Sequence, residues 1–245
     1  MRRDVRILLG TLVLGGGFLA WEHGTDFVTE MDTFRVEQVE VRGVRLVDDD
    51  ELVGLLALEP TSSIWSDATV WEQRVEEHPM IEEATVSRRF PDGLTVEVSE
   101  RRPVALAPTP TLEPIDVEGH RLPVDPSSHR LDLPVLTTDR TPASGSPVVP
   151  DEVRALAREI GRIMAADTAF LQRVSELGWR DDGSLRLRWT EPPVDFLLPA
   201  GTPPARLREG LSALADAMGR RPTDPPEEID LRFADQVVVR RTRGQ

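Results

Sequence analysis

The sequence predicts an α+β fold with three parts: a single N-terminal transmembrane helix, a β-α-α-β-β unit, and a C-terminal, mostly antiparallel β domain with two helices. Three observations lead to this prediction. The chain of 245 residues begins with a basic stub followed by an uncharged apolar segment. Beyond that segment, short stretches alternate apolar and polar residues, as half-buried strands do. Between these stretches, apolar residues recur at helical spacing, and Pro, Gly and Asp mark turns.

The predicted signal anchor comprises residues 7–23, and residues 1–6 form a cytoplasmic stub. The uncharged stretch Ile7–Trp21 is only about 22 Å long as a helix, which is shorter than the hydrocarbon core of a bilayer. Arg6 therefore extends the span by snorkelling, and Trp21 suits the opposite interface. The basic stub orients the anchor with its N-terminus in the cytoplasm.

A cleaved secretory signal is the alternative interpretation of the same segment. Cleavage needs small residues at positions −3 and −1, and a cut after Ala20 would place the bulky Phe18 at −3. The sequence therefore favours an uncleaved anchor. In both cases the bulk of the chain lies outside the cytoplasm.

The first unit after the anchor is predicted as β-α-α-β-β. Its strands are expected in the alternating stretches Phe34–Gly43, Ala84–Phe90 and Leu94–Glu100. One helix follows an aspartate cap at 48–50, and the next follows Ser66 or Asp67. The last two strands are joined by Pro91-Asp92-Gly93, whose composition is typical of a hairpin turn, with Gly93 able to adopt a positive φ. Two helices covering one face of a three-stranded sheet can bury a small core.

The second unit follows a Pro-rich crossover, Pro103–Pro114. Its helices are expected at Asp151–Ala166 and Pro203–Met218, where apolar residues lie on one face. Its strands are expected at Leu112–Val117, Val174–Trp179, Leu185–Thr190, Val194–Leu198, Ile229–Phe233 and Val237–Arg241.

Composition and motifs argue against an enzyme. The chain has no cysteine, which excludes disulfides, thiolate nucleophiles and cysteine-ligated zinc. Its net charge of −14 makes nucleic-acid binding a poor hypothesis, since that needs a basic surface. The four histidines lie in no metal-ligand spacing, and no phosphate-binding or nucleophile motif occurs. We expect no catalytic residue, no metal and no cofactor, and we expect an interaction protein.

Five sequence segments together resemble the FtsQ/DivIB family of bacterial cell-division proteins. The segments are VEQVEVRGV (36–44), HPMIEEATVSRRFPDGLTVEVSERRPVA (78–105), IDVEGHRLP (115–123), LPVL (133–136) and IDLRFADQVVVR (229–240). The resemblance implies a POTRA domain at 34–104, an FtsQ-type β domain at 105–241 and a tail at 242–245.

The resemblance also implies a function. Members of this family are non-enzymatic scaffolds of the divisome in the cell inner membrane. They link bitopic coiled-coil proteins of the FtsB/DivIC and FtsL type, and other septal proteins, during cytokinesis and septal wall synthesis. Such a protein takes no small-molecule substrate and binds no nucleic acid.

The family's second domain binds a partner strand beside its last strand, which directs attention to the C-terminal strand here. A terminal edge strand has unpaired N–H and C=O groups available for strand addition. In Val237–Arg241, alternation places Val237 and Val239 on one face and Val238 and Arg240 on the other. An ordinary core strand with a frayed tail is the competing interpretation. The predicted partner-binding residues are Arg232, Phe233, Val237, Val238, Val239, Arg240 and Arg241.

Arg232 has two possible roles at this stage, because it either positions the neighbouring strand through a carboxylate or is simply solvated. Two alternative functions also remain. One is a POTRA-containing envelope assembly or protein-transport factor, and the other is a secreted hydrolase, against which the missing catalytic motifs argue.

Overall fold

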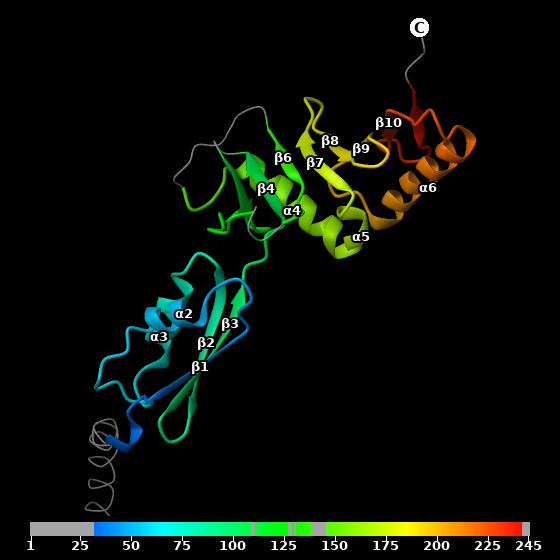
Figure 1. Ribbon diagram of the computed structural model, residues 1–245. Helices are drawn as coiled ribbons and strands as arrows, with labels where there is room; N and C mark the ends of the chain where they lie inside the picture. The colour runs from blue at the N-terminus through cyan, green and yellow to red at the C-terminus, as the bar shows by residue number, and fades with distance from the viewer. Residues whose placement is uncertain (1–31, 109–110, 127–128, 130, 139–145, 242–245) are drawn as a thin grey trace, which may run out of the picture. The chain divides into compact units, whose positions relative to one another are not determined.

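The computed structural model describes residues 32–108, 111–126, 129, 131–138 and 146–241. The chain divides into two compact units, residues 1–100 and 101–245 (Figure 1). The predicted transmembrane helix at residues 7–23 lies outside the described residues. Among the helices that the structure does describe, none combines the length and the apolar character that crossing a membrane requires.

The first unit has the predicted β-α-α-β-β order. A short 3-10 helix, Asp32–Phe34, precedes these elements. The elements are β1 (Gln38–Arg42), α2 (Asp49–Leu55), α3 (Ala68–Glu76), β2 (Ile81–Arg89) and β3 (Gly93–Glu100). The sheet order is β1-β3-β2, with β1 parallel and β2 antiparallel to the central β3.

Local sequence signals place both helices of this unit. Asp48 caps α2 by accepting a hydrogen bond from the Asp50 N–H, and Asp67 caps α3 by accepting one from Thr69. The apolar residues Trp71 and Val75 of α3 are buried, as their four-residue spacing predicts. The structure confirms these sequence expectations.

The turn between β2 and β3 differs from the expectation in one detail. Gly93 does not have a positive φ. A Cβ atom at Gly93 would instead lie 3.0 Å from the backbone oxygen of Arg89, so glycine is needed there for close packing of the hairpin.

The segment that follows β1 is tied to the end of β3 by one carboxylate. Gly43 has φ +94°, and a Cβ there would lie 2.1 Å from the backbone oxygen of Val98, so the chain can turn here only with glycine. The turn directs three successive N–H groups, those of Arg45, Leu46 and Val47, at Glu100 Oε1, at 2.8, 3.0 and 3.0 Å. Glu100 thus satisfies three backbone donors at once.

In the described residues, the second unit contains an eight-stranded sheet and three helices. Its strands are β4 (Ala105–Pro108), β5 (Leu112–Ile115), β6 (Val135–Thr137), β7 (Val174–Trp179), β8 (Leu185–Trp189), β9 (Val194–Leu198), β10 (Glu228–Asp230) and β11 (Val238–Arg240). Its helices are α4 (Asp151–Ala166), α5 (Thr168–Leu171) and α6 (Pro204–Arg220). The strand order is β11-β10-β9-β8-β7-β6-β4-β5.

Most strand pairings in the described part of this sheet are antiparallel, as predicted, but the sheet also contains parallel pairs, and the short helix α5 adds to the two helices that the sequence predicted. Four pairings are antiparallel and three are parallel: β4 with β6, β6 with β7, and β9 with β10. Two of the parallel pairs are joined by helical crossovers, α4–α5 between β6 and β7 and α6 between β9 and β10. Parallel neighbours need a crossover connection of this kind, because the second strand starts again from the same end of the sheet.

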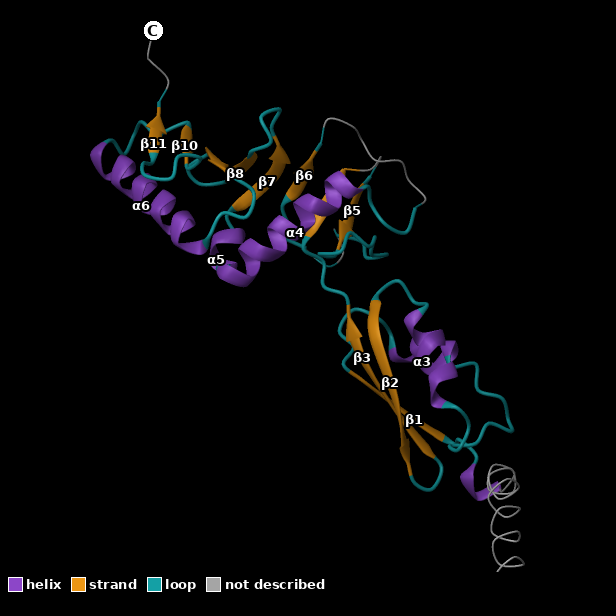
Figure 2. Ribbon diagram, turned by 180° about the vertical axis from the view of Figure 1, so that it is seen from behind, coloured by secondary structure: helices purple, strands orange, loops and turns teal. Residues whose placement is uncertain are grey.

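The helices of the second unit run along the sheet (Figure 2). Helix α4 contacts β4, β6 and β7, and helix α6 contacts β10 and β11. The apolar faces of both helices join one core with the sheet, and residues such as Leu156, Ile160 and Phe196 are fully buried in it. Helix α6 therefore supports the C-terminal end of the sheet.

We predict that Glu100→Ala destabilises the first unit by about 1–3 kcal/mol, because three N–H groups lose their acceptor. Hydrogen exchange of the β1 and β3 amides would measure the change. Glu97→Ala is the matched control on the same strand, since the Glu97 side chain is 63% exposed and lies 3.9 Å from Arg42; it should change stability by less than about 0.5 kcal/mol. Equal effects of the two substitutions would contradict the role assigned to Glu100.

Candidate partner-binding edge

The C-terminal strand forms one edge of the eight-stranded sheet. Within the described residues β11 pairs with β10 alone, in an antiparallel register that places Val239 opposite Ile229. Figure 2 shows β11 at the end of the sheet, next to α6. The strand covers Val238–Arg240, which is shorter than the predicted 237–241.

The backbone of β11 has a defined open side. The Glu227 N–H donates to the Arg240 carbonyl at 3.0 Å, so this carbonyl points toward β10. Because backbone groups alternate in direction along a strand, the N–H and C=O of Val239 point to the open side. An added strand would exchange its hydrogen bonds with Val239.

A groove lies between β11 and α6 on one face of this edge. Its volume is about 380 Å³, and it is lined by Val239 and Arg241 together with Ala213, Asp216, Ala217 and Arg220 of α6. Val237 packs against the core of the unit. The alanines provide a shallow apolar floor, and the charged side chains lie around it.

A second groove, of about 340 Å³, has Arg240 in its lining. The other lining residues are Arg188, Pro193, Asp195, Glu227 and Glu228. Val239 and Arg240 therefore line different grooves, in agreement with the alternation expected from the sequence. The lining of this second groove is mainly charged, with both signs present.

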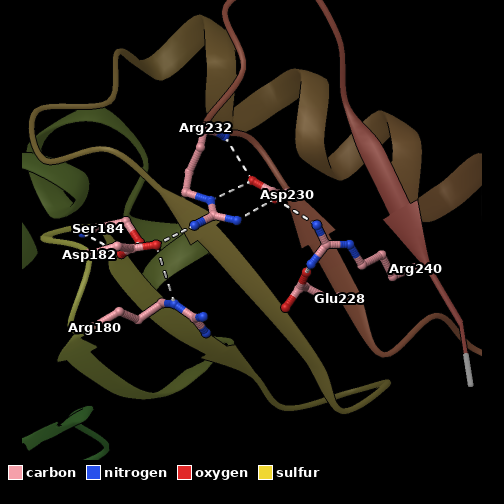
Figure 3. Close-up of polar contacts among 7 residues, drawn as sticks. All are labelled: Arg180, Asp182, Ser184, Glu228, Asp230, Arg232 and Arg240. Atoms are coloured by element: carbon pink, nitrogen blue, oxygen red, sulfur yellow. Dashed lines mark hydrogen bonds and ion pairs between the residues drawn. The ribbon is translucent and has the colours of Figure 1, made fainter.

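The turn after β10 is fixed by a buried ion pair (Figure 3). Asp230 is fully buried, and Arg232 donates to both of its carboxylate oxygens, from Nε at 2.9 Å and from Nη2 at 2.7 Å. The Arg232 N–H adds a third bond, at 3.1 Å. These hydrogen bonds lower the pKa of Asp230 and raise that of Arg232. Arg232 thus positions a strand through a carboxylate, which is the first of the two roles considered for it.

Two further elements join this ion pair. Arg232 also contacts Asp182, which lies in the turn between β7 and β8, and hydrogen bonds from Ser184 lower the pKa of that carboxyl. From β11, Arg240 Nη2 lies 3.5 Å from Asp230 Oδ2, and Arg240 also bonds to Glu228. Figure 3 shows these side chains converging from three segments of the sheet.

Two arginines connect α6 to the segments on either side of β11. Near the N-terminus of α6, Arg206 donates to the carbonyls of Gln236, at 2.6 Å, and of Phe233. At the other end, Arg241 Nη2 donates to the Ala217 carbonyl at 2.8 Å, where a cation is favourable in the last turns of a helix. Sequence reasoning missed Arg206 and Asp182, because only the fold brings them to this edge.

The predicted site residues do not all lie on the strand. Arg232 and Phe233 lie in the connection between β10 and β11, and the Phe233 side chain is 43% exposed. Val238, Val239 and Arg240 form the edge strand, whereas Val237 and Arg241 flank it. Arg6 and Trp21, the predicted anchor residues, lie outside the described residues.

Two other sheet edges are closed by the chain itself. The outward N–H groups of β2 at Ala84 and Val86 donate to the α3 carboxylates of Glu76, at 3.1 Å, and Glu72, at 2.8 Å. At β5, the Pro114 carbonyl accepts a hydrogen bond from Leu122. These contacts occupy groups that strand addition would need.

Charged side chains on β1 disfavour the addition of another strand at that edge. Glu40 on this strand bonds to Arg42 and also pairs with Arg89 from β2. Charged side chains on an edge disfavour pairing with another chain. Compared with the β1, β2 and β5 edges, the β11 edge therefore has both outward-facing backbone groups and an adjoining groove.

The described residues contain no cluster of three or more histidine, cysteine or acidic side chains that could hold a metal ion. The carboxylates of the candidate edge are paired with arginines rather than grouped with one another. This geometry suits structural support of a strand.

A family model described as "POTRA domain, FtsQ-type" matches residues 34–101. The chain is 31% identical to the cell division protein FtsQ of Rhodothermus marinus, over 98% of this chain and 87% of that protein. It is 28% identical to the FtsQ of Salinibacter ruber, over 98% of this chain and 94% of that protein. An alignment with the FtsQ of Myxococcus fulvus, at 33% identity, covers 51% of this chain and spans only 45% of that protein.

We predict that Asp230→Asn destabilises the protein by about 1–3 kcal/mol at pH 7, since it removes the charge that Arg232 neutralises. The lowered pKa of Asp230 means that its contribution is complete above the unfolded value of about 3.9 and is lost as the pH falls below it. The stability difference between wild type and variant should therefore shrink below about pH 4.

Urea unfolding followed by circular dichroism at pH 7, 4 and 3 would test this prediction. Asp216→Asn is the matched control on α6, because the Asp216 side chain is 70% exposed and pairs only with the exposed Arg220 in the described contacts. A difference between wild type and Asp230→Asn that stays constant over this pH range would show that the charge of Asp230 does not stabilise the edge.

Proposed function

The chain belongs to the FtsQ/DivIB family of cell division proteins, and we propose that it is a single-pass scaffold of the divisome that captures a partner strand at the open edge of β11. The anchor is the apolar segment at 7–23, with the N-terminus in the cytoplasm and the bulk of the chain outside the inner membrane. The protein acts at the division septum and has no enzymatic activity.

The observation that carries the proposal is the open side of β11. Val239 directs both of its backbone groups outward, so one residue of an added strand can exchange two hydrogen bonds with it. Side chains directly opposite each other in antiparallel strands lie on the same face. In an antiparallel addition, the partner side chain opposite Val239 therefore enters the groove beside α6.

The groove restricts which side chain fits best. Ala213 and Ala217 favour an apolar group. Asp216 already pairs with Arg220, so Arg241 is the cation of the lining that favours an acidic neighbour. We propose that the partners are bitopic coiled-coil proteins of the FtsB/DivIC and FtsL type, each carrying an extended segment beside its coiled coil. Other septal proteins bind elsewhere on the same scaffold.

The comparisons favour cell division over the alternative of an envelope assembly or transport factor. Each relative described above is named a cell division protein, and the matched POTRA model is of the FtsQ type. No geometric observation on the described residues favours hydrolysis.

We predict that Val239→Pro weakens partner capture about tenfold or more, since it removes the outward N–H donor and adds bulk at the edge. Proline is tolerated on an edge strand where its missing N–H faces solvent, so the fold should remain intact. Copurification of the full-length chain with the coiled-coil partners measures the effect. Val239→Thr keeps the donor and is the matched control. Equal partner recovery with both variants would exclude strand addition at Val239.

Val238 is a less suitable test position. It lies opposite Asp230 in the register, and alternation directs its N–H toward β10. Proline at Val238 would therefore break the internal pairing of β11 rather than the contact with a partner.

We predict that depletion of the protein produces filamentous cells, because septal wall synthesis loses its scaffold. A fluorescent fusion of the full chain should gather at midcell before constriction. Normal division together with a uniform membrane signal would contradict the divisome role.

A further inference from the structure

Three aromatic side chains of the first unit form a cluster at the margin of its core, which Phe34 contacts. Phe34, Trp65 and Phe90 contact one another edge to face, with ring centroids 5.4 to 6.5 Å apart. They come from three separate segments: the 3-10 helix before β1, the loop before α3, and the turn between β2 and β3. We refer to these three residues as the aromatic cluster.

Two of the three rings are exposed, and backbone hydrogen bonds join the segments that carry them. Phe90 is 62% exposed and Trp65 is 38% exposed, whereas Trp71 of the same unit is buried. The Ile64 N–H donates to the Phe34 carbonyl at 2.9 Å, and Arg88 Nε donates to the Ile64 carbonyl at 2.6 Å. These hydrogen bonds join the segments that carry the rings, and the exposed rings form an apolar surface of the kind found at binding sites.

The chemistry of this surface suits a membrane interface. Tryptophan and phenylalanine are stable at the level of the lipid head groups, where an apolar ring is buried and polar groups remain hydrated. The guanidinium carbon of Arg88 lies 5.5 Å from the centre of the Trp65 ring. Arg35 follows Phe34 directly and is exposed. Both arginines place positive charge beside the rings, which suits the level of the lipid phosphates.

The position of the cluster along the chain indicates that the lipid bilayer is what it binds. The uncharged segment Ile7–Trp21 ends twelve residues before Phe34, counted as Glu22 to Thr33. A connection of this length spans at most about 43 Å. Phe34 is itself a member of the cluster, so the chain enters the first unit at this surface.

We propose that the aromatic cluster inserts into the outer interface of the membrane to which the chain is anchored, and that it thereby orients the first unit on the lipid surface. This inference rests on the proposed anchor but not on partner binding at β11. It assigns a lipid-binding role to residues outside the candidate partner-binding edge.

The absence of cysteine makes a labelling test direct, because one introduced thiol is unique. The full-length chain carrying Phe90→Cys is labelled with an environment-sensitive dye and reconstituted into vesicles of phosphatidylcholine and phosphatidylglycerol. Glu77→Cys is the control, since it is exposed and lies beyond the opposite end of β2, a strand about 26 Å long.

In vesicles, the label at position 90 should show blue-shifted emission, quenching by brominated lipids and about threefold weaker quenching by aqueous iodide than the label at position 77. Equal iodide quenching at both positions, with the chain floating with the vesicles, would overturn the inference and leave the anchor intact. Protection from iodide without quenching by brominated lipid would also overturn it, because protein rather than lipid would then cover the cluster. A chain that does not float with the vesicles would refute the proposed anchor, and the inference with it.

Discussion

The buried charge of Asp230 is the constraint on which the C-terminal edge depends. A fully buried carboxylate is unfavourable unless it is paired, and Arg232, two residues later, provides the pairing. The Arg232 N–H also donates to the Asp230 carboxylate, and this Asx-turn contact bends the chain directly after Asp230. Because Arg232 also reaches Asp182 and Arg240 reaches Asp230, the same carboxylate links the β7–β8 turn, β10 and β11. These three segments of the sheet thus depend on one ion pair.

The backbone groups at the edges of the two sheets are either hydrogen-bonded within the chain, as at β2 and β5, or left exposed, as at β11. Glu72 and Glu76 occupy the outward N–H groups of β2, and the chain itself covers part of β5. At β11, side chains instead hold the strand against α6. Arg206 of α6 donates to the Gln236 carbonyl before the strand, and Arg241 after the strand donates to the Ala217 carbonyl of α6. An edge that is fixed in position but keeps its outer backbone groups exposed is pre-organised for strand addition.

The sequence predicted the longer elements well and the shortest strands poorly. The bounds of α4, β7 and β9 agree with those expected from the sequence. Strand β4 was missed, because Ala105, Leu106 and Ala107 are all buried and show no alternation, and prolines flank the stretch. Strand β6 was missed because three residues are too few for a periodic signal. The predicted strand 229–233 ends early, at Asp230, for the electrostatic reason given above.

The candidate edge was predictable as a terminal strand, but its supporting contacts were not. Arg206 lies about 30 residues before its acceptor Gln236, and Asp182 lies 50 residues before Arg232. Only the fold brings such pairs together, because no local pattern encodes them. The short length of β11 also limits how partners can be recognised. A strand as short as β11 offers few backbone bonds to any partner, so discrimination between partners must depend on the side chain that enters the groove beside α6.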